Sequence, residues 1–339
     1  MIQHNKPTVC EQDKISLNRV LDSNWLSAGK EVSNFESNFA AQFEMSREHA
    51  VAVSSGSAAL FLSLLAMSAK GKKVAVPTYS CTSIENAVHL SGALPMYVDT
   101  CKTHFNLDQS LAKEADIIIH PHMFGYPSII DQSLKHKTIE DCAQSIGSRV
   151  NGKLVGLQGE LGVFSFYATK MLTSSGQGGM VISSNRDYIN FIRDYIEFDQ
   201  KSDGKNRFNL SMTDIQAAMG SSQLKKLHDY FIPKREEIFQ QYCSTGKYFY
   251  DDDDKRVKPV RFRALLKVSS PSASIDFLYK KGINTILPIT EKELLGSASN
   301  SFQNARDHIS SWVSIPCYPS LTNPEIKAII ESLNKMEYI

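Results

Sequence analysis

Between Val51 and Ser184 the chain alternates short, continuous apolar runs with segments of helical periodicity, and this alternation limits the folds open to it. The runs lack the polar alternation of a sheet with one solvated face, so helices are expected to cover both faces of a largely parallel sheet. An open, twisted α/β sheet is therefore predicted. Its strands are expected at residues 51–53, 73–76, 95–98, 116–120, 138–140, 163–167 and 180–183.

The region after Asn209 indicates a second unit. A long helical pattern from Thr213 to about Tyr242 leads the chain out of the sheet region. Four adjacent carboxylates at 251–254 predict a solvated turn, because they repel one another and lack the spacing of a calcium loop. Strand-like runs at 261–268 and 283–286 and a helix at 323–336 follow. We expect a large domain, 1–225, which includes the N-terminal segment, and a smaller α+β C-terminal domain, 226–339.

Composition excludes several classes of protein. The 339 residues are 42% hydrophobic and 22% charged, the profile of a globular chain. A formal net charge of +1 gives no global field for nucleic acid or an anionic membrane, so neither is expected as a partner. Six scattered cysteines without a C-x-x-C pair indicate reduced thiols. With no apolar N-terminal leader and no membrane span, a cytoplasmic location is expected.

Polar residues interrupt the apolar pattern where the predicted strands end. Ligands of open α/β sheets bind beyond the carboxyl ends of the strands, so loops from distant parts of the chain are expected to meet in one cleft. Five such loops contain Ser55–Ser57, Tyr79–Thr82, His122, Asp141–Gln144 and Ser165–Lys170.

Three of these loops could together bind a phosphorylated pyridine. Gly56 and Ser57 open a predicted helix, whose unpaired N–H groups favour an anion. Asp141 could bond a protonated ring nitrogen, although capping the next segment is an alternative role, with Gln144 as its capping-box partner. Lys170 could hold pyridoxal phosphate, although a lysine after a strand is more often a surface residue. These groups for a phosphate, a ring nitrogen and an aldehyde are the only complete set for one ligand that we find in the sequence.

Other chemistries have weaker support. The chain has no Walker lysine motif, no G-x-G-x-x-G after the first strand and no H-E-x-x-H. His120 and His122 are interpreted as hydrogen-bonded structural histidines, and no metal site is predicted. The glycines at 176–179 could form a flexible stretch beside Lys170 or a plain hairpin turn.

An ordered series of motifs resembles the DegT/DnrJ/StrS family of pyridoxal-phosphate aminotransferases, which has the fold of aspartate aminotransferase. Glu140–Gln144 is similar to the family's E-D-A-A-Q, and Phe164–Lys170 to its F-S-F-x-x-x-K. The likeness runs nearly end to end. Its other motifs are Phe35-Glu36 with Phe39-Ala40, Ser55–Leu60, Gly92-Ala93 with Pro95 and Val98-Asp99, His122 with Phe124–Pro127, Gly178–Met180, Asn209 with Met212 and Gln216–Ala218, and Ile315-Pro316 with Tyr318-Pro319.

The resemblance implies a role for each matching residue. Lys170 would attach covalently to pyridoxal 5'-phosphate and carry the proton, and Asp141 would pair with the pyridinium nitrogen. Gln144 would lie against the ring, while Gly56, Ser57 and Ser165 would bind the phosphate. Asn209 would reach the cofactor of a neighbouring subunit, so a homodimer with shared sites is expected.

Two positions depart from the family's pattern. Cys81 stands where many members place an aromatic residue against the cofactor ring, which weakens stacking. Ser211 stands where the family often has arginine, so a charge that could meet an acidic substrate is missing. The lysine at position 170 argues against the dehydrating subgroup, which has histidine there.

Three functions follow as hypotheses. The first is transfer of an amino group, with glutamate as donor, to a nucleotide-linked keto sugar for polysaccharide or related amino-sugar biosynthesis. The second keeps the cofactor but uses a small phosphorylated or cyclic ketone. The third is a non-catalytic regulator or scaffold of the same fold.

Overall fold

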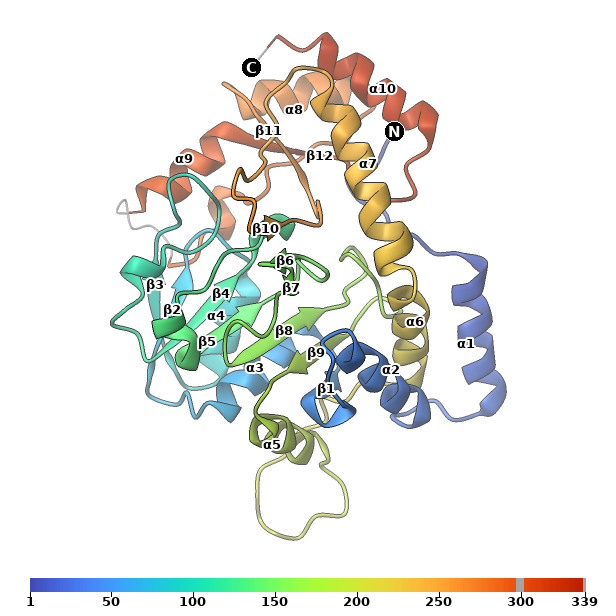
Figure 1. The fold of residues 1–339 in the computed structure, drawn as a ribbon, viewed down its shortest axis with the longest axis vertical. Helices are drawn as coiled ribbons and strands as arrows, with labels where there is room; N and C mark the ends of the chain where they lie inside the picture. The colour runs from blue at the N-terminus through green and yellow to red at the C-terminus, as the bar shows by residue number, and fades with distance from the viewer. Residues whose placement is uncertain (297–301, 338–339) are drawn as a thin grey trace.

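The computed structural model of the chain describes residues 1–296 and 302–337, and a seven-stranded sheet forms its centre (Figure 1). The strand order is β1-β9-β8-β5-β4-β2-β3. β9 runs antiparallel to both of its neighbours, and the other adjacent pairs are parallel. The predicted mostly parallel, mixed sheet is confirmed. Its strands are β1 (Ala50–Val53), β2 (Lys73–Pro77), β3 (Leu94–Val98), β4 (Ile117–Pro121), β5 (Thr138–Asp141), β8 (Leu161–Ser165) and β9 (Gly179–Ile182).

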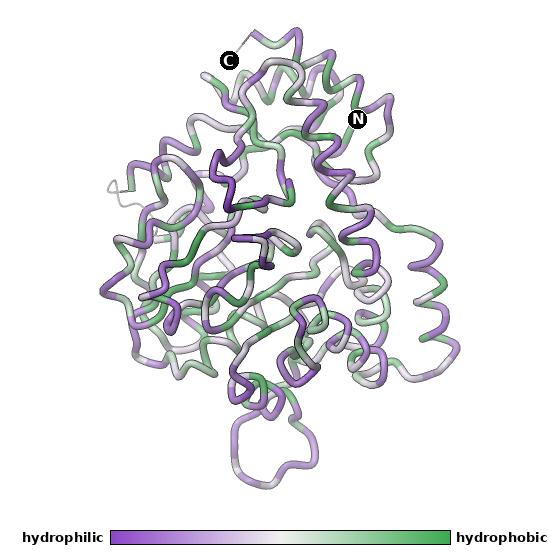
Figure 2. The backbone as a smooth tube through the Cα atoms, in the orientation of Figure 1, coloured by the Kyte–Doolittle hydropathy of each residue, from purple (hydrophilic) through white to green (hydrophobic). Residues whose placement is uncertain are grey.

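Alternate residues of β1 enter two different cores. In β1, Val51 and Val53 join the core that contains α3 (Gly56–Ala66), α4 (Thr82–Leu90) and α5 (Arg186–Ile196). Ala50 and Ala52 instead face α2 (Lys30–Ala41), whose Phe35 and Phe39 pack on β8 and the residue after it. Figure 2 shows the hydrophobic residues concentrated along these central strands. Burial on both faces explains the continuous apolar runs.

Three predicted strands differ from the structure by more than one residue, and one of them, the run at 261–268, is a strand only over Ala264–Lys267. The run at 163–167 is β8, which begins two residues earlier because Leu161 and Gly162 pair with β5. It ends at Ser165, where the chain turns toward Lys170. The prediction of a strand at 283–286 is wrong. Ile283 forms a single bridge with Ile2, and Ile286 forms a single bridge with Ser314.

The long helix expected from Thr213 to Tyr242 is interrupted. It consists of α6 (Asp214–Leu224), a π-helical turn (Leu227–Phe231) and α7 (Ile232–Cys243). Pro233 has no N–H group to continue an α-helical ladder, which accounts for a change of helix type here. α6 also packs against α1 (Glu11–Ser23).

The C-terminal part has its own core. The antiparallel strands β11 (Ala264–Lys267) and β12 (Trp312–Ile315) pack with α7, α8 (Pro271–Lys280) and α10 (Asn323–Asn334). Ile2 joins this core by pairing with Ile283, so the first residues of the chain lie on the C-terminal part. The boundary at residue 225 stays a prediction.

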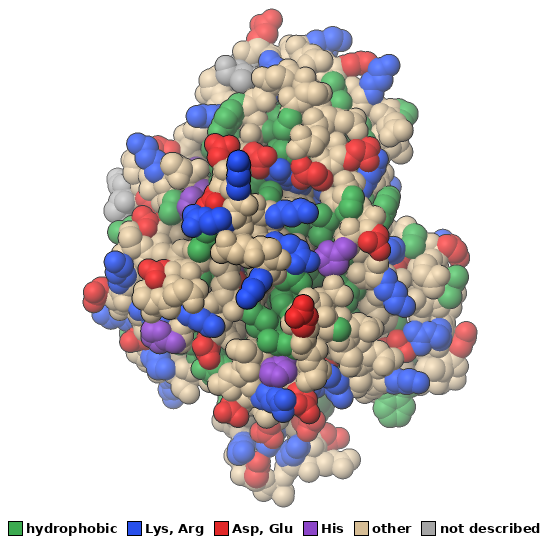
Figure 3. Space-filling model, viewed as in Figure 1, with side chains coloured by type: hydrophobic (Ala, Val, Ile, Leu, Met, Phe, Trp, Pro, Cys, Tyr) green, Lys and Arg blue, Asp and Glu red, His purple; other side chains and the backbone are tan. Residues whose placement is uncertain are grey.

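Shorter elements complete the described fold: α9 (Gln303–Ser311), β6 (Arg149–Val150), β7 (Lys153–Leu154) and β10 (Val257–Lys258). On the face seen in Figure 3, acidic and basic side chains are interspersed, in keeping with the small net charge. Within the two described ranges, no helix combines the length and apolar character needed to cross a bilayer.

Candidate active site

A cavity of about 470 Å³ opens at the carboxyl ends of the parallel strands, where the sequence predicted a cleft. The C-terminal part closes one side through Phe262, Arg263 and Glu293. The cavity brings together seven of the eight predicted site residues, which are Gly56, Ser57, Cys81, Asp141, Gln144, Ser165 and Lys170.

One end of the cavity is the N-terminus of α3. Ser55 caps the helix by accepting a 3.1 Å hydrogen bond from the Ala58 N–H. Across residues 1–296 and 302–337, the N–H groups of Gly56 and Ser57 have no acceptor. Gly56 packs directly on β8, since a Cβ there would lie 2.7 Å from the Cβ of Ser165. Two free donors, a helix dipole and the Ser165 hydroxyl thus form a cradle for an anion such as phosphate.

Asp141 provides a buried carboxylate at the end of β5. Its Oδ1 accepts a 2.9 Å hydrogen bond from the Ala143 N–H, so the capping role suggested as an alternative is present as well. Oδ2 accepts no hydrogen bond in the described part of the chain. Burial raises the pKa of Asp141, while the Ala143 bond and the nearby Lys170 lower it less. A cationic partner at Oδ2 would relieve this cost.

Lys170 lies in the turn that follows β8. Its backbone N–H donates to the Tyr167 carbonyl at 2.9 Å, and the adjacent Thr169 carbonyl accepts from the Asn5 side chain at 2.8 Å. The Lys170 Nζ is 5.5 Å from the centroid of the Phe262 ring. Burial lowers the pKa of Lys170, and Asp141 only partly opposes this shift. A larger fraction of this amine is therefore neutral than for an exposed lysine.

His122 and Glu140 form a buried pair next to Asp141, and His122 also lines the cavity. His122 Nδ1 accepts from the Ser128 N–H at 3.1 Å, so Nε2 carries the proton and donates to Glu140 at 2.9 Å. Glu140 also accepts from the N–H groups of Gly156 and Gly159 at 3.0 and 2.7 Å. Burial raises the pKa of Glu140, but these hydrogen bonds outweigh it and lower the pKa overall.

The ligand atoms of His122, Glu140 and Cys142 lie within 4.8 Å of one another, as in some metal sites. The hydrogen bonds above already engage the histidine and the carboxylate, so the group is a structural network. His122 is a hydrogen-bonded structural histidine as predicted. For His120 the same prediction is wrong, because both of its ring nitrogens are buried and have no partner in the described residues.

The remaining predicted residues occupy different positions. Gln144 is not a capping-box partner of Asp141; its Oε1 accepts from the Phe124 N–H at 2.8 Å while its side chain lines the cavity. Cys81 precedes α4 and lines the cavity with an exposed thiol. Asn209 is exposed and does not line the cavity. It does lie beside it, because the next carbonyl, of Leu210, accepts from the Ser54 N–H at 2.7 Å.

The sequence did not indicate Phe262, Arg263 or Glu293 as site residues. They belong to the C-terminal part, and only its packing over the sheet brings them to the cavity. The one available signal was Arg263, the second arginine at the start of the apolar run 261–268. Arginines in such positions are too common to indicate a site.

A profile of the DegT/DnrJ/EryC1/StrS aminotransferase family matches residues 7–334. The chain belongs to this family. It is 27% identical to GDP-perosamine synthase of Escherichia coli O157:H7, over 97% of each chain. Its fold matches the aminotransferase TlmJ from Streptoalloteichus hindustanus with a TM-score of 0.92 at 23% identity, over 99% of this chain and 98% of that one. The PLP form of the putative sugar aminotransferase Spr1654 from Streptococcus pneumoniae matches with a TM-score of 0.86 at 20% identity, over 98% and 97%.

Membership in the DegT/DnrJ/EryC1/StrS family confirms the predicted resemblance and the predicted enzyme class, a pyridoxal-phosphate-dependent aminotransferase. The fold is confirmed as that of the family's structures. The enzyme is thereby favoured over a non-catalytic scaffold. The cradle at α3, the free oxygen of Asp141 and the half-buried amine of Lys170 are chemically suited to the phosphate, ring nitrogen and aldehyde of this cofactor, and all three line one cavity.

Proposed function

We propose that the protein transfers an amino group, with glutamate as donor, to a keto sugar linked to a nucleotide. The observation that carries this proposal is the convergence of Lys170, Asp141 and the N-terminus of α3 on one cavity. The name of GDP-perosamine synthase, a relative that matches nearly the whole chain, supports a nucleotide-linked substrate. Amino-sugar biosynthesis for a polysaccharide is the role that follows.

In this proposal the cofactor phosphate lies at Gly56, Ser57 and Ser165, and its ring nitrogen faces Asp141. Bound pyridoxal phosphate would supply an aldehyde group that carries the amino group from donor to ketone and a ring that accepts electrons. Asp141 keeps the ring nitrogen protonated, and this cationic partner offsets the cost of the buried carboxylate. Gln144 and Cys81 would border the ring.

Lys170 would act as the base. Its Nζ would move a proton from the α-carbon of the donor to the aldehyde carbon of the cofactor, and would move it in the opposite sense when the ketone is aminated. Burial favours the neutral amine that this step needs, as the lowered pKa indicates. The Asn5 hydrogen bond to Thr169 would help to fix the turn that carries Lys170.

Spectroscopy of the purified protein tests the proposal. Adding pyridoxal phosphate should produce an absorbance band that depends on Lys170, and Lys170→Ala should abolish it. If the wild-type protein shows no such band, the cofactor assignment fails.

A panel of ketones then tests the substrate. The aminated cofactor should return to its aldehyde form fastest with a nucleotide-linked keto sugar. A faster reaction with a small keto phosphate would favour the alternative substrate, which the serine at position 211 leaves open.

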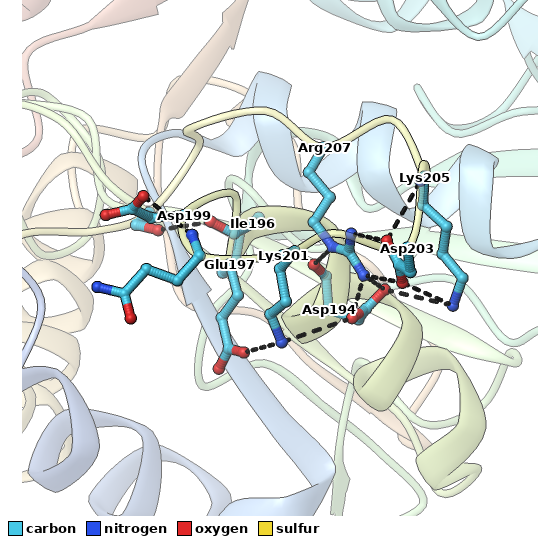
Figure 4. Close-up of polar contacts among 10 residues, drawn as sticks. Asp194, Ile196, Glu197, Asp199, Lys201, Asp203, Lys205 and Arg207 are labelled. Atoms are coloured by element: carbon cyan, nitrogen blue, oxygen red, sulfur yellow. Dashed lines mark hydrogen bonds and ion pairs between the residues drawn. The ribbon is translucent and has the colours of Figure 1, made fainter.

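We further propose that the active unit is a homodimer in which Asn209 serves the partner's site. The segment 197–208, just before Asn209, extends away from the body in Figure 1. Arg207 holds it together through Asp194 and Asp203, at 2.8 and 2.6 Å (Figure 4). Phe198 and Phe208 on this segment are 51% and 60% exposed, and a second subunit would cover them.

We also propose a cytoplasmic location for the protein. The six free cysteines agree with it.

A further inference from the structure

Arg263 lines the same cavity as Lys170 and has no role in holding the cofactor as proposed above. The phosphate is met by the N-terminus of α3, and the ring nitrogen by Asp141. Of the charged residues that line the cavity, Arg263 and Glu293 are left over. The Arg263 guanidinium and the Lys170 ammonium lie near the same ring, at 5.6 and 5.5 Å from the centroid of Phe262. Arg263 is also among the charges that lower the pKa of Lys170, so a second cation lies near the reacting amine.

The partners of Arg263 are neutral. Its Nη1 donates to His4 Nε2 at 3.1 Å and lies 3.4 Å from the Ser314 hydroxyl. Burial lowers the pKa of His4 to about 3, and the nearby arginines add to the shift, so this ring is an uncharged acceptor. Phe124 and Phe262 flank the guanidinium at 5.9 and 5.6 Å. These contacts orient the side chain without neutralising it.

Glu293 acts on Arg263 only through its nearby charge and forms no ion pair with it. Its Oε2 accepts from the Thr290 N–H and hydroxyl at 2.8 and 2.7 Å, which closes a capping box. Within the described residues, no carboxylate lies within ion-pair distance of Arg263. The Arg263 Nε is buried without an acceptor, and Nη2 donates to no described protein group. The Nε and Nη2 edge of the guanidinium is thus unused.

Two neighbouring arginines, Arg261 and Arg235, have the hydrogen-bonding partners expected of structural arginines. Arg261 bonds two carboxylates, those of Asp251 and Glu236. Arg235 is fully buried and donates to the backbone carbonyls of residues 261, 262 and 317. Arg263 has neither kind of partner, and it alone of the three lines the cavity. A ligand would complete its coordination.

We propose that Arg263 is a specificity-determining residue that binds a carboxylate of the substrate, and that His4 is its positioning residue. A guanidinium edge with two parallel N–H donors matches the two oxygens of a carboxylate. The carboxylate comes from the amino donor or from an acidic group on the keto substrate. This inference rests on the proposed function, since it places the anion beside the amine of Lys170. Arg263 would also offer an acidic substrate a positive charge in place of the arginine that the family often has where this chain has Ser211.

Binding of an unreactive dicarboxylate tests the proposal on the cofactor-loaded protein. Glutarate carries no amino group, so calorimetry measures binding without turnover, and the neutral diamide glutaramide is the matched probe. Arg263→Gln should weaken glutarate binding by about 10- to 100-fold, and Arg263→Lys should weaken it less. Equal glutarate affinity in wild type and Arg263→Gln would overturn the proposal.

Glu293→Gln is a control that should act in the opposite direction. The amide keeps the capping box with Thr290 but removes the negative charge, so glutarate should bind a few-fold more tightly. For His4, Ala should weaken glutarate binding and Asn, which retains an acceptor, should restore part of it. Rescue by Asn separates positioning from general stability, which the melting temperature of each variant monitors.

Two half-reactions distinguish the sources of the carboxylate. Alanine and ethylamine differ only in the carboxylate. If Arg263 binds the carboxylate of the amino donor, Arg263→Gln should slow amination of the cofactor by alanine and leave the rate with ethylamine unchanged. If only the reaction of acidic ketones slows, the anion belongs to the keto substrate. No change in either half-reaction contradicts the proposal. Failure of the proposed function would show separately, as absence of the Lys170-dependent absorbance.

Discussion

Gly56 and Ser165 lie so close that a Cβ on Gly56 would be 2.7 Å from the Cβ and 3.0 Å from the Oγ of Ser165. Gly56→Ala should therefore push the N-terminus of α3 away from β8. We expect cofactor affinity to fall by about 10- to 100-fold, in line with an overpacking cost of about 1–3 kcal/mol. Fluorescence titration with pyridoxal phosphate measures this change.

Ser165→Gly tests the cause of the Gly56→Ala effect. It removes the side chain that the new methyl group would meet, so the double variant should lose less affinity than the two single variants predict together. Simple additivity would show that the contact between the two residues is not what positions the cradle.

Asp141→Asn should have opposite effects on stability and on catalysis. Burial raises the pKa of Asp141 in the folded cofactor-free protein, so its contribution to stability is present at low pH and lost as pH rises through that pKa. Because the amide cannot ionise, the cofactor-free variant should melt above wild type at neutral pH, and the difference should vanish below about pH 4. A lower melting temperature at neutral pH would contradict this view.

In the loaded enzyme the same change removes the proposed partner of the ring nitrogen. We expect the rate of amino transfer to fall by about 10²-fold or more. The Asn side chain can still accept from the Ala143 N–H, so the loss would reflect charge and not the cap.

Asp13 should dominate the acid sensitivity of the N-terminal helix. It is fully buried and accepts from Lys226 at 2.7 Å, Ser222 at 2.6 Å and Gln223 at 2.8 Å, which ties α1 to α6 and the residues after it. Burial raises the pKa of Asp13, but these bonds lower it overall. Its stabilising contribution is therefore present above the unfolded pKa of about 3.9 and lost as pH falls.

Asp13→Asn should lower the free energy of unfolding by about 3–5 kcal/mol at neutral pH, as for a broken buried ion pair. Urea denaturation measures this cost, which should shrink at about pH 3. Asp22→Asn makes the same change at an exposed position of the same helix and should have little effect. A pH-independent cost for Asp13→Asn would rule out the charge as its origin.

Mixing two inactive variants tests the shared site. If Asn209 serves the partner's cavity, a heterodimer of Lys170→Ala and Asn209→Ala subunits contains one intact site. Refolding the two together should restore about a quarter of wild-type activity, because half of the dimers are mixed and each has one complete site. No recovery, with dimers verified by sedimentation, would mean that Asn209 acts within its own subunit.

Much of the fold was predictable because its signals are local. Continuous apolar runs located every strand of the central sheet, and the polar residues at their ends located seven cavity residues. The π-helical turn was not predictable, because Leu224, Leu227 and Phe231 continue the apolar spacing of an ordinary helix through it.

The missed part of the site depends on contacts between distant residues. Asn5 and Thr169 are 164 positions apart, and His4 and Arg263 are 259 apart. No periodicity links such positions, and the closing of the C-terminal part over the sheet is what makes them neighbours. The prediction of a hydrogen-bonded His120 and the alternative capping role of Gln144 were wrong for the same reason. Whether each side chain finds a hydrogen-bonding partner depends on residues outside its own strand or loop.

The pairing of Ile2 with Ile283 sets an order of events during synthesis. The Ile2 N–H donates to the Gly282 carbonyl, and the Asn284 N–H donates to the Ile2 carbonyl, at 2.7 and 2.9 Å. A nascent chain exposes its first residues for the time needed to add some 280 more, about 15–55 s at typical rates. The turn that carries Lys170, which Asn5 holds, and the Arg263 side chain, which His4 holds, can therefore reach their final arrangement only near the end of translation.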